Sequence, residues 1–320
     1  MGQCLSMGAA GSKTPQASVR ASAFKTILDQ YESIGEVQDG LRQAGLESSQ
    51  MIIGIDFTKS NEWTGKSSFN GQSLHSVLGQ GPNLYEQGLS IIAKTLAAFD
   101  DDNLIPCYGF GDNTTGDRTV FSFFPQDRPA NGLQGAVLRY RQIAPYIQLA
   151  GPTSFAPLIR QAMRLVVESE MQYHILVIIA DGQVTPTCMQ ATVDAIVSAS
   201  KLPLSIIMVG VGDGPWDQME DFDDNLPARM FDNFQFLNFG KVMEQASVYG
   251  SNHEKVEAHF AVHALMEIPE QFSIIQKLGL MQPNSRFQID RNTQLVLPPP
   301  PKVLQADQNP GDGASAPSFL

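Results

Sequence analysis

The sequence has few cysteines, and this limits the chemistry it can support. Only three occur in 320 residues, at Cys4, Cys107 and Cys188. They are too few and too scattered for a disulfide framework or a cysteine-rich zinc site. We therefore expect a reducing compartment.

Basic residues are scarce as well. The chain has 21 Lys and Arg against 33 Asp and Glu, which gives a formal net charge of −12 and a pI near 4.8. No two basic residues are adjacent in the sequence. Because the phosphate backbone of nucleic acids favours clustered Lys and Arg, this composition argues against non-specific nucleic-acid binding.

Long apolar runs are also missing. No stretch approaches the roughly 20 apolar residues that span a bilayer, and the first residues lack the apolar core of a secretory signal. The apolar content is nevertheless 42%, enough for a sizeable buried core in a chain of this length. We expect the protein in the cytoplasm or on the cytoplasmic face of a membrane, in particular the plasma membrane.

The N-terminus carries a pattern that predicts lipidation. Met1–Ser6 reads MGQCLS and fits the acceptor motif for myristoylation of Gly2. Palmitate on Cys4 would add the second acyl chain that stable anchoring requires. The alternative is a chance match in a flexible segment, and residues 1–20 have the composition of such a segment.

From residue 21 the pattern predicts an ordered domain. Helical spacing of apolar residues indicates one or two helices over 21–46. From residue 51 apolar strands alternate with amphipathic helices, which is typical of a doubly wound α/β sheet. We predict strands at 51–56, 104–109, 119–124, 173–180, 203–210 and 234–238. We predict helices at about 84–99, 133–148, 155–169, 187–200 and 240–263, followed by a helical stretch to about 280.

Three connecting segments carry further expectations. The turn between the strands at 104–109 and 119–124 is too short for a crossover helix, so these strands should pair antiparallel, with one of them at the sheet edge. Residues 61–83 form a long polar loop, and such loops in compact domains usually have a function. Residues 281–320 are rich in Pro and Gly and predict a flexible tail.

Oxygen-bearing side chains stand at the ends of the predicted strands. Asp56, Thr58 and Ser60 follow the strand at 51–56, and Asp181 follows the strand at 173–180. Open parallel sheets bind ligands beyond the carboxyl ends of their strands. Together with Thr153 these residues predict a site for Mg²⁺, Mn²⁺ or Ca²⁺, which prefer hard oxygen ligands. Taken singly, each Asp could instead cap a helix.

Several stretches of the sequence resemble the copine-type von Willebrand factor A domains, and most closely those of plant RING-domain ubiquitin ligases. The resemblance covers about residues 20–280. The stretches that carry it are Ala44–Ser49 (AGLESS), Ile55–Gly65 (IDFTKSNEWTG), Tyr108–Asp112 (YGFGD) and Gly151–Pro157 (GPTSFAP).

This resemblance implies a metal-ion-dependent adhesion site. In it Asp56, Thr58, Ser60, Thr153 and Asp181 would ligate a divalent ion, with Mg²⁺ preferred, and a carboxylate of a partner protein would complete the coordination. A RING module needs about eight Cys and His ligands for zinc. Neither residue type occurs after residue 280, so we expect no ligase activity from this chain alone.

Other motifs support weaker interpretations. His259 and His263 have helical spacing, but no third metal ligand is evident, so a partly buried helix face is the preferred interpretation. Gly210–Gly214 (GVGDG) lacks the Lys-Ser/Thr pair of a nucleotide-binding loop. Asp112 and Asp213 lie in Gly-rich turns and are interpreted as turn formers, with an outer-shell role considered for Asp112.

The sequence therefore predicts a non-enzymatic, lipid-anchored protein-binding module. The alternative is the substrate-recruiting part of a ubiquitin ligase whose RING is absent from this chain, working with ubiquitin-conjugating machinery. A structural paralogue that keeps the ligands without using them is a third interpretation.

Overall fold

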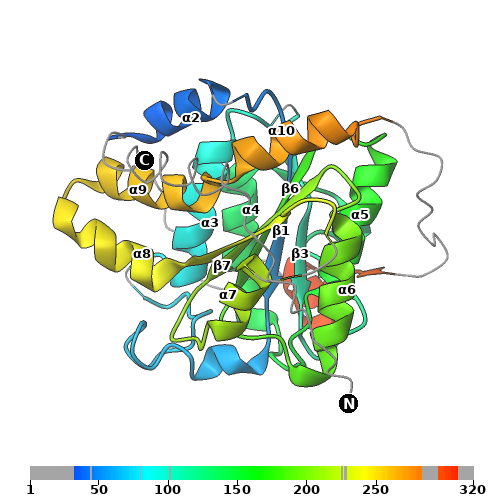
Figure 1. Ribbon diagram of the computed structural model, residues 1–320. Helices are drawn as coiled ribbons and strands as arrows, with labels where there is room; N and C mark the ends of the chain where they lie inside the picture. The colour runs from blue at the N-terminus through cyan, green and yellow to red at the C-terminus, as the bar shows by residue number, and fades with distance from the viewer. Residues whose placement is uncertain are drawn as a thin grey trace, which may run out of the picture.

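The computed structural model describes residues 32–43, 45–79, 81–100, 102–224, 226, 229–282 and 295–308. These residues form an α/β fold with a seven-stranded sheet between two layers of helices (Figure 1). The strand order is β8-β7-β6-β1-β3-β4-β9, and all neighbours are parallel except β3 and β4. The strands are β1 (Gln50–Asp56), β3 (Cys107–Phe110), β4 (Val120–Ser122), β6 (His174–Ala180), β7 (Leu204–Gly210), β8 (Phe234–Asn238) and β9 (Val296–Leu297), and β2 (Leu104–Ile105) pairs separately with β5 (Ala130–Asn131).

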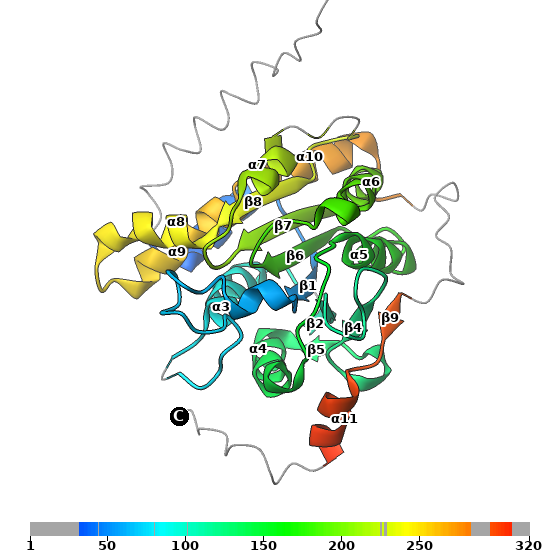
Figure 2. The same ribbon diagram turned by 90° about the horizontal axis from the view of Figure 1, so that it is seen from below.

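Helices cover both faces of the sheet. Residues of α2, α3, α4, α8, α9 and α10 pack on one face, and residues of α5, α6 and α7 pack on the other (Figure 2). The helices are α2 (Ile34–Gln43), α3 (Leu84–Leu96), α4 (Gly132–Ile143), α5 (Ala156–Glu168), α6 (Met189–Ala199), α7 (Asp217–Asp224), α8 (Phe239–Ala246), α9 (His253–Leu265), α10 (Ile268–Leu278) and α11 (Pro301–Gln308).

The central strand β1 contributes to both layers because successive side chains of a strand point to opposite faces. Ile53 and Ile55 belong to the core under α3 and α4, whereas Ile52 belongs to the core under α5 and α6. Gly54 lies on the second face, where a Cβ would come within 2.1 Å of the Leu158 side chain of α5. The missing side chain therefore lets α5 pack directly against β1.

The strand register brings the ends of β1 and β6 to one edge of the sheet. Ile55 pairs with Ile179, and Asp56 pairs with Phe110 at the end of β3. The residue after β6 is Asp181. Because parallel strands run in the same direction, Asp56 and Asp181 reach the same carboxyl edge.

The sequence predicted this architecture, and the mostly parallel α/β sheet is confirmed. Strand β4 pairs antiparallel with β3, as expected. The expected edge position of this pair is wrong, because β9 pairs with β4 and forms the edge of the sheet. The predicted helix at 240–263 is two helices, because the chain turns at Gly250 (φ +58°) and Asn252 then caps α9. Helix α7 was not predicted, and the part of the helical prediction before residue 32 lies outside the described residues.

The predicted flexible tail at 281–320 is wrong for residues 295–308. Strand β9 pairs with β4, and Val303 of α11 is buried in the core. The guanidinium of Arg139 on α4 donates to both carboxylate oxygens of Asp307, at 2.7 and 2.8 Å. This segment therefore packs on the domain as part of it.

None of the helices in the described ranges combines the length and the apolar composition of a membrane span. The predicted lipidation sites Gly2 and Cys4 lie outside the described residues.

Candidate metal centre

The first part of the centre follows β1 directly. Asp56 ends the strand, and its Oδ1 accepts a hydrogen bond from the backbone N of Thr58 (2.7 Å). The hydroxyls of Thr58 and Ser60 lie 3.0 Å apart, with Ser60 in the short 3₁₀ helix Lys59–Glu62. Gly111, at φ +78°, leaves room for the Thr58 side chain, because a Cβ there would lie 2.3 Å from the Thr58 methyl.

Asp181 joins this group from β6. Ser60 Oγ donates to Asp181 Oδ1 (2.9 Å), and Thr64 Oγ1 donates to Asp181 Oδ2 (2.5 Å). A serine hydroxyl has one proton, so Thr58 is the donor in its contact with Ser60. Side chains from two strand ends thus form one chain of hydrogen bonds from Thr58 through Ser60 to Asp181.

Thr153 reaches the same edge on the loop before α5. Its backbone N donates to Thr185 Oγ1 (3.0 Å), and Thr185 N donates to the Thr153 carbonyl (3.0 Å). The preceding loop is fixed to the residues after β1, since Lys59 N donates to the Ala150 carbonyl (2.7 Å). The hydrogen bonds found for Thr153 are therefore those of its backbone, whereas the other four predicted ligands are linked through their side chains.

The two carboxylates are buried, and this is electrostatically unfavourable without a cation. Asp56 and Asp181 both have 0% exposure. Burial raises the pKa of Asp56, and the neighbouring Asp181 carboxylate raises that pKa further. Burial also raises the pKa of Asp181, against the hydrogen bonds from Thr64 and Ser60. Asp56 Oδ2 is buried and has no hydrogen-bond partner among the described residues.

This donor set fits a hard divalent cation. Two carboxylates and three hydroxyls supply oxygen only, which suits Mg²⁺, Mn²⁺ or Ca²⁺. No group of three or more His, Cys, Asp or Glu in the described ranges could hold a metal, so an ion here would depend on the hydroxyls. A cation would also offset the mutual repulsion of the two buried carboxylates.

Behind Asp56 lies a buried aromatic cluster that the sequence did not reveal. The His75 ring lies between Phe57 and Tyr85, with ring centroids 4.6 and 4.3 Å away. Burial lowers the pKa of His75 to about 3, so the ring is neutral. Its Nε2 donates to the Asp56 carbonyl (2.8 Å), and its Nδ1 accepts from Tyr140 Oη (2.9 Å). His75 therefore fixes the backbone of Asp56, the first of the predicted ligands.

The long loop after β1 is held in place by hydrogen bonds to the turn after β7. Asp213, expected only to form a turn, accepts hydrogen bonds from the backbone N of Ser67 and Ser68, both at 2.8 Å. Its own backbone N donates to the Thr64 carbonyl (2.7 Å). Thr64 was also missed, although it lies in the quoted IDFTKSNEWTG stretch, because its role depends on the path of the loop.

The remaining candidates are Asp112, which follows Gly111 at the same edge of the sheet, and the histidine pair of α9. Asp112 accepts hydrogen bonds from the hydroxyls of Thr114 and Thr115, as a turn former does. His259 and His263 lie on α9 with ring centroids 4.3 Å apart, and His263 Nδ1 is 2.8 Å from the His259 carbonyl.

The sheet order, with Asp56 and Asp181 at the ends of neighbouring parallel strands, defines a doubly wound α/β domain. A family model described as Copine matches residues 73–284. The chain therefore belongs to the copine family.

The chain is also similar to individual proteins over most of its length. The chain is 52% identical over 306 residues to E3 ubiquitin-protein ligase RGLG2 of Arabidopsis thaliana, covering 92% of this chain and 64% of that protein. It is 52% identical over 291 residues to E3 ubiquitin-protein ligase RGLG3 of the same plant, covering 88% of this chain and 77% of that protein. The chain thus spans about two thirds to three quarters of the length of these two relatives.

Solved structures are more distant. The von Willebrand factor type A structure from Catenulispora acidiphila covers 68% of this chain and 43% of its own, with 10% identity and a TM-score of 0.39.

Proposed function

We propose that the chain is a protein-binding module that uses a divalent ion to bind an acidic residue of its partner. Asp56, Thr58, Ser60, Thr153 and Asp181 would hold the ion, with Mg²⁺ as the expected cofactor. The bound ion would supply a fixed positive charge with a coordination position for a partner carboxylate. The buried Asp56 Oδ2 without a hydrogen-bond partner, beside the carboxylate of Asp181, is the observation that carries this proposal.

The residues of this chain prepare the site before any ion arrives. Ser60 and Thr64 orient the Asp181 carboxylate by one hydrogen bond to each oxygen. His75 holds the Asp56 backbone from behind. A site whose ligands are already oriented loses little conformational entropy on binding, which favours affinity.

Calorimetric titration of Mg²⁺, Mn²⁺ and Ca²⁺ into metal-free protein tests this proposal. We expect saturable binding to the wild type and no binding to Asp181→Asn, which preserves shape but removes one charge. Asp217→Asn is the matched control, since Asp217 is exposed on α7. Equal metal affinity in wild type and Asp181→Asn would overturn the proposed site.

We also propose that acyl chains on Gly2 and Cys4 attach the module to the cytoplasmic face of membranes, particularly the plasma membrane. The support is the MGQCLS pattern, because two acyl chains give stable anchoring where one does not. In cells, Gly2→Ala should move the protein from the membrane fraction to the cytoplasm. Membrane association that survives Gly2→Ala together with Cys4→Ser would refute this anchoring.

The second candidate function is recruitment of substrates for ubiquitin ligation. The names of RGLG2 and RGLG3 favour it, since those relatives are described as E3 ubiquitin-protein ligases. We expect the chain alone to show no autoubiquitination with activating enzyme, a panel of conjugating enzymes and ubiquitin. Robust autoubiquitination would establish an enzymatic role instead.

A further inference from the structure

A tryptophan lies exposed beside the proposed metal centre. Trp63 is 59% exposed and follows the ligand Ser60 by three residues. Its backbone N donates to the Ser60 carbonyl (2.9 Å), as does the backbone N of Thr64 (3.0 Å). The tryptophan is therefore displayed from a turn that the metal centre itself holds in place.

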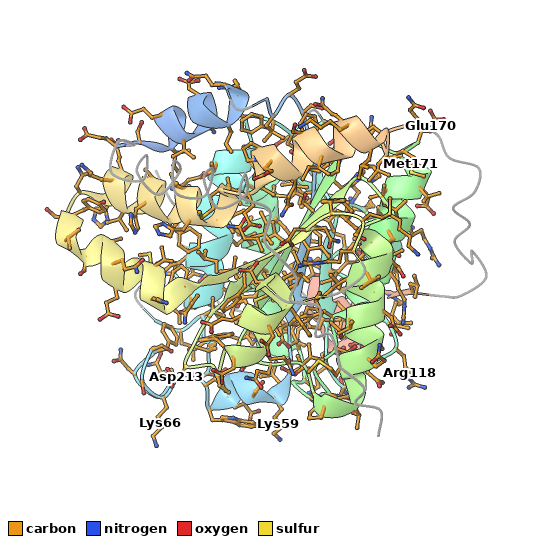
Figure 3. The ribbon with its side chains drawn as sticks, in the orientation of Figure 1. Lys59, Lys66, Arg118, Glu170, Met171 and Asp213 are labelled. Carbon is orange, nitrogen blue, oxygen red and sulfur yellow. The ribbon has the colours of Figure 1, made fainter. Side chains whose placement is uncertain are left out.

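Two lysines flank this tryptophan. Lys59 and Lys66 are both exposed, and Figure 3 shows them at the lower edge of the molecule, the edge where the strands end. Within the described part of the chain, no ion pair is found for either lysine, whereas Lys94 and Lys255 elsewhere pair with acids. We define Lys59, Trp63 and Lys66 as the Trp63 surface.

Two acidic residues, Asp213 and Glu62, lie near the Trp63 surface, and they differ in whether their carboxylates already accept hydrogen bonds. Burial raises the pKa of Asp213, but the hydrogen bonds that Asp213 accepts from the loop, including those from the backbone N of Ser67 and Ser68, outweigh burial and lower that pKa. Glu62 is exposed and would repel a partner acid placed next to it. The remaining attraction for an anion comes from the two lysines and from the ion in the metal centre.

We infer that the Trp63 surface selects the partner, and that the partner is an acidic protein segment with an apolar side chain beside its metal-binding carboxylate. This inference rests on the proposed function. The metal would take the carboxylate, Trp63 would pack against the apolar side chain, and Lys59 and Lys66 would attract a second acid. Tryptophan on a fixed turn is typical of the few residues that dominate the affinity of an interface.

The charge of the whole chain supports this choice of partner. At a net charge of −12, the protein as a whole repels acidic segments. Lys59 and Lys66, next to a bound divalent ion, would make this part of the surface positively charged. Such local charge complementarity raises the association rate of an acidic partner and selects the orientation in which it binds. An acidic segment would therefore be captured at this edge and disfavoured elsewhere.

Selection from a library of random linear peptides tests the inference on the full chain. The library is bound in Mg²⁺, eluted by chelation, and the enriched peptides are resynthesised for affinity measurement. We expect enriched peptides to carry an acid beside an aromatic or aliphatic residue, with a second acid nearby. Trp63→Ala and the double variant Lys59→Glu/Lys66→Glu should each weaken binding by at least about tenfold.

Matched controls separate this surface from general effects. Val248→Ala removes another exposed apolar side chain (79% exposed), and Lys201→Glu/Lys277→Glu reverses two exposed lysines away from the centre. Both should bind as the wild type does. Peptide binding that needs Asp181 but is unchanged in both Trp63-surface variants would overturn this inference and leave the proposed function standing.

Two other outcomes are equally decisive. Peptide binding that survives Asp181→Asn but is lost in Trp63→Ala would support the Trp63 surface and refute the metal-dependent function.

Phosphatidylserine vesicles are tested in parallel. Vesicle binding that depends on Trp63 and the lysines, with no peptide enriched, would overturn the assignment of a protein partner.

Fluorescence gives an independent readout. The chain has two tryptophans, and Trp216 packs against Phe236, with ring centroids 5.5 Å apart. In a Trp216→Phe variant, emission therefore reports Trp63 alone. We expect a blue shift when a selected peptide binds in Mg²⁺, and emission that stays unchanged at saturating peptide would contradict burial of Trp63 by the partner.

Discussion

Replacement of Asp56 by Asn should stabilise the metal-free protein and destabilise the metal-loaded protein relative to wild type. Asn keeps the acceptor oxygen that bonds Thr58 N (2.7 Å in the wild type). It removes a negative charge buried beside Asp181, and it gives the side-chain position of the partnerless Oδ2 a donor that can bond the Asp181 carboxylate. In the proposed site the same substitution would remove a charged ligand of the ion.

The size of the metal effect follows from linkage. An ion at about one hundred times its Kd stabilises the folded state by about 2.7 kcal/mol. For a domain of about 250 residues, each kcal/mol shifts Tm by roughly 2–4 °C, so Mg²⁺ should raise the wild-type Tm by about 5–11 °C. Asp56→Asn should lose most of this increase.

The pH dependence has a definite sign. The folded pKa of Asp56 is raised, so without metal this carboxyl opposes folding at neutral pH, and acidification through its folded pKa relieves that effect. With Mg²⁺ bound, protonation competes with the ion, and acidification should lower Tm instead. Differential scanning calorimetry in chelator and in Mg²⁺, over a pH series, measures both signs.

A lower Tm for Asp56→Asn than for wild type in chelator would refute the account of the buried charge pair. An equal Mg²⁺-induced rise in both proteins would refute the role of Asp56 as a ligand. Asp217→Asn, an exposed control, should behave as the wild type in both media.

Three further predictions concern other residues. Thr64→Val should weaken Mg²⁺ binding in calorimetry, because it removes the hydroxyl that orients the Asp181 carboxylate. A hydrogen bond to a charged group contributes about 1.5–3 kcal/mol. An unchanged Kd would contradict this prediction. The hydrogen bonds from Arg139 lower the pKa of Asp307. The docking of α11 should therefore be complete above the ordinary pKa of Asp and should weaken as the pH falls through the lowered pKa of the folded state. Hydrogen-exchange rates of residues 301–308 that do not change on acidification would contradict this prediction. Gly54→Ala should lower stability by about 1–3 kcal/mol in urea unfolding, since the added Cβ meets a leucine side chain of α5 at 2.1 Å, whereas full stability would show that α5 moves freely.

The sequence could predict the sheet because its strands are buried on both faces and read as apolar runs ended by polar residues. The same logic located Asp56 and Asp181, since parallel strands with known ends share one edge. Strand β9 and α11 could not be predicted from the sequence. Only two residues of β9 pair with β4, and the run of prolines that follows them has the composition of a flexible tail. Strand β9 docks on β4, and Asp307 of α11 accepts hydrogen bonds from Arg139; both partners are far away in the sequence.

The residues that support the centre were out of reach for a different reason. His75 and Thr64 act through the path of a long loop, which local patterns do not specify. Their partners, the Asp56 carbonyl and the Asp181 carboxylate, become neighbours only after the loop folds back under the hydrogen bonds of Asp213. Position at a strand end is therefore readable from sequence, whereas orientation of the ligands is not.

The most direct test of the metal centre is a crystal structure of the protein soaked in Mn²⁺, with anomalous scattering used to locate the ion. The account predicts one strong peak at the carboxyl edge of the sheet, bonded to oxygens from the set Asp56, Thr58, Ser60, Thr153 and Asp181. Saturating Mn²⁺ with no peak among these residues, or with the ion bound elsewhere, would contradict it.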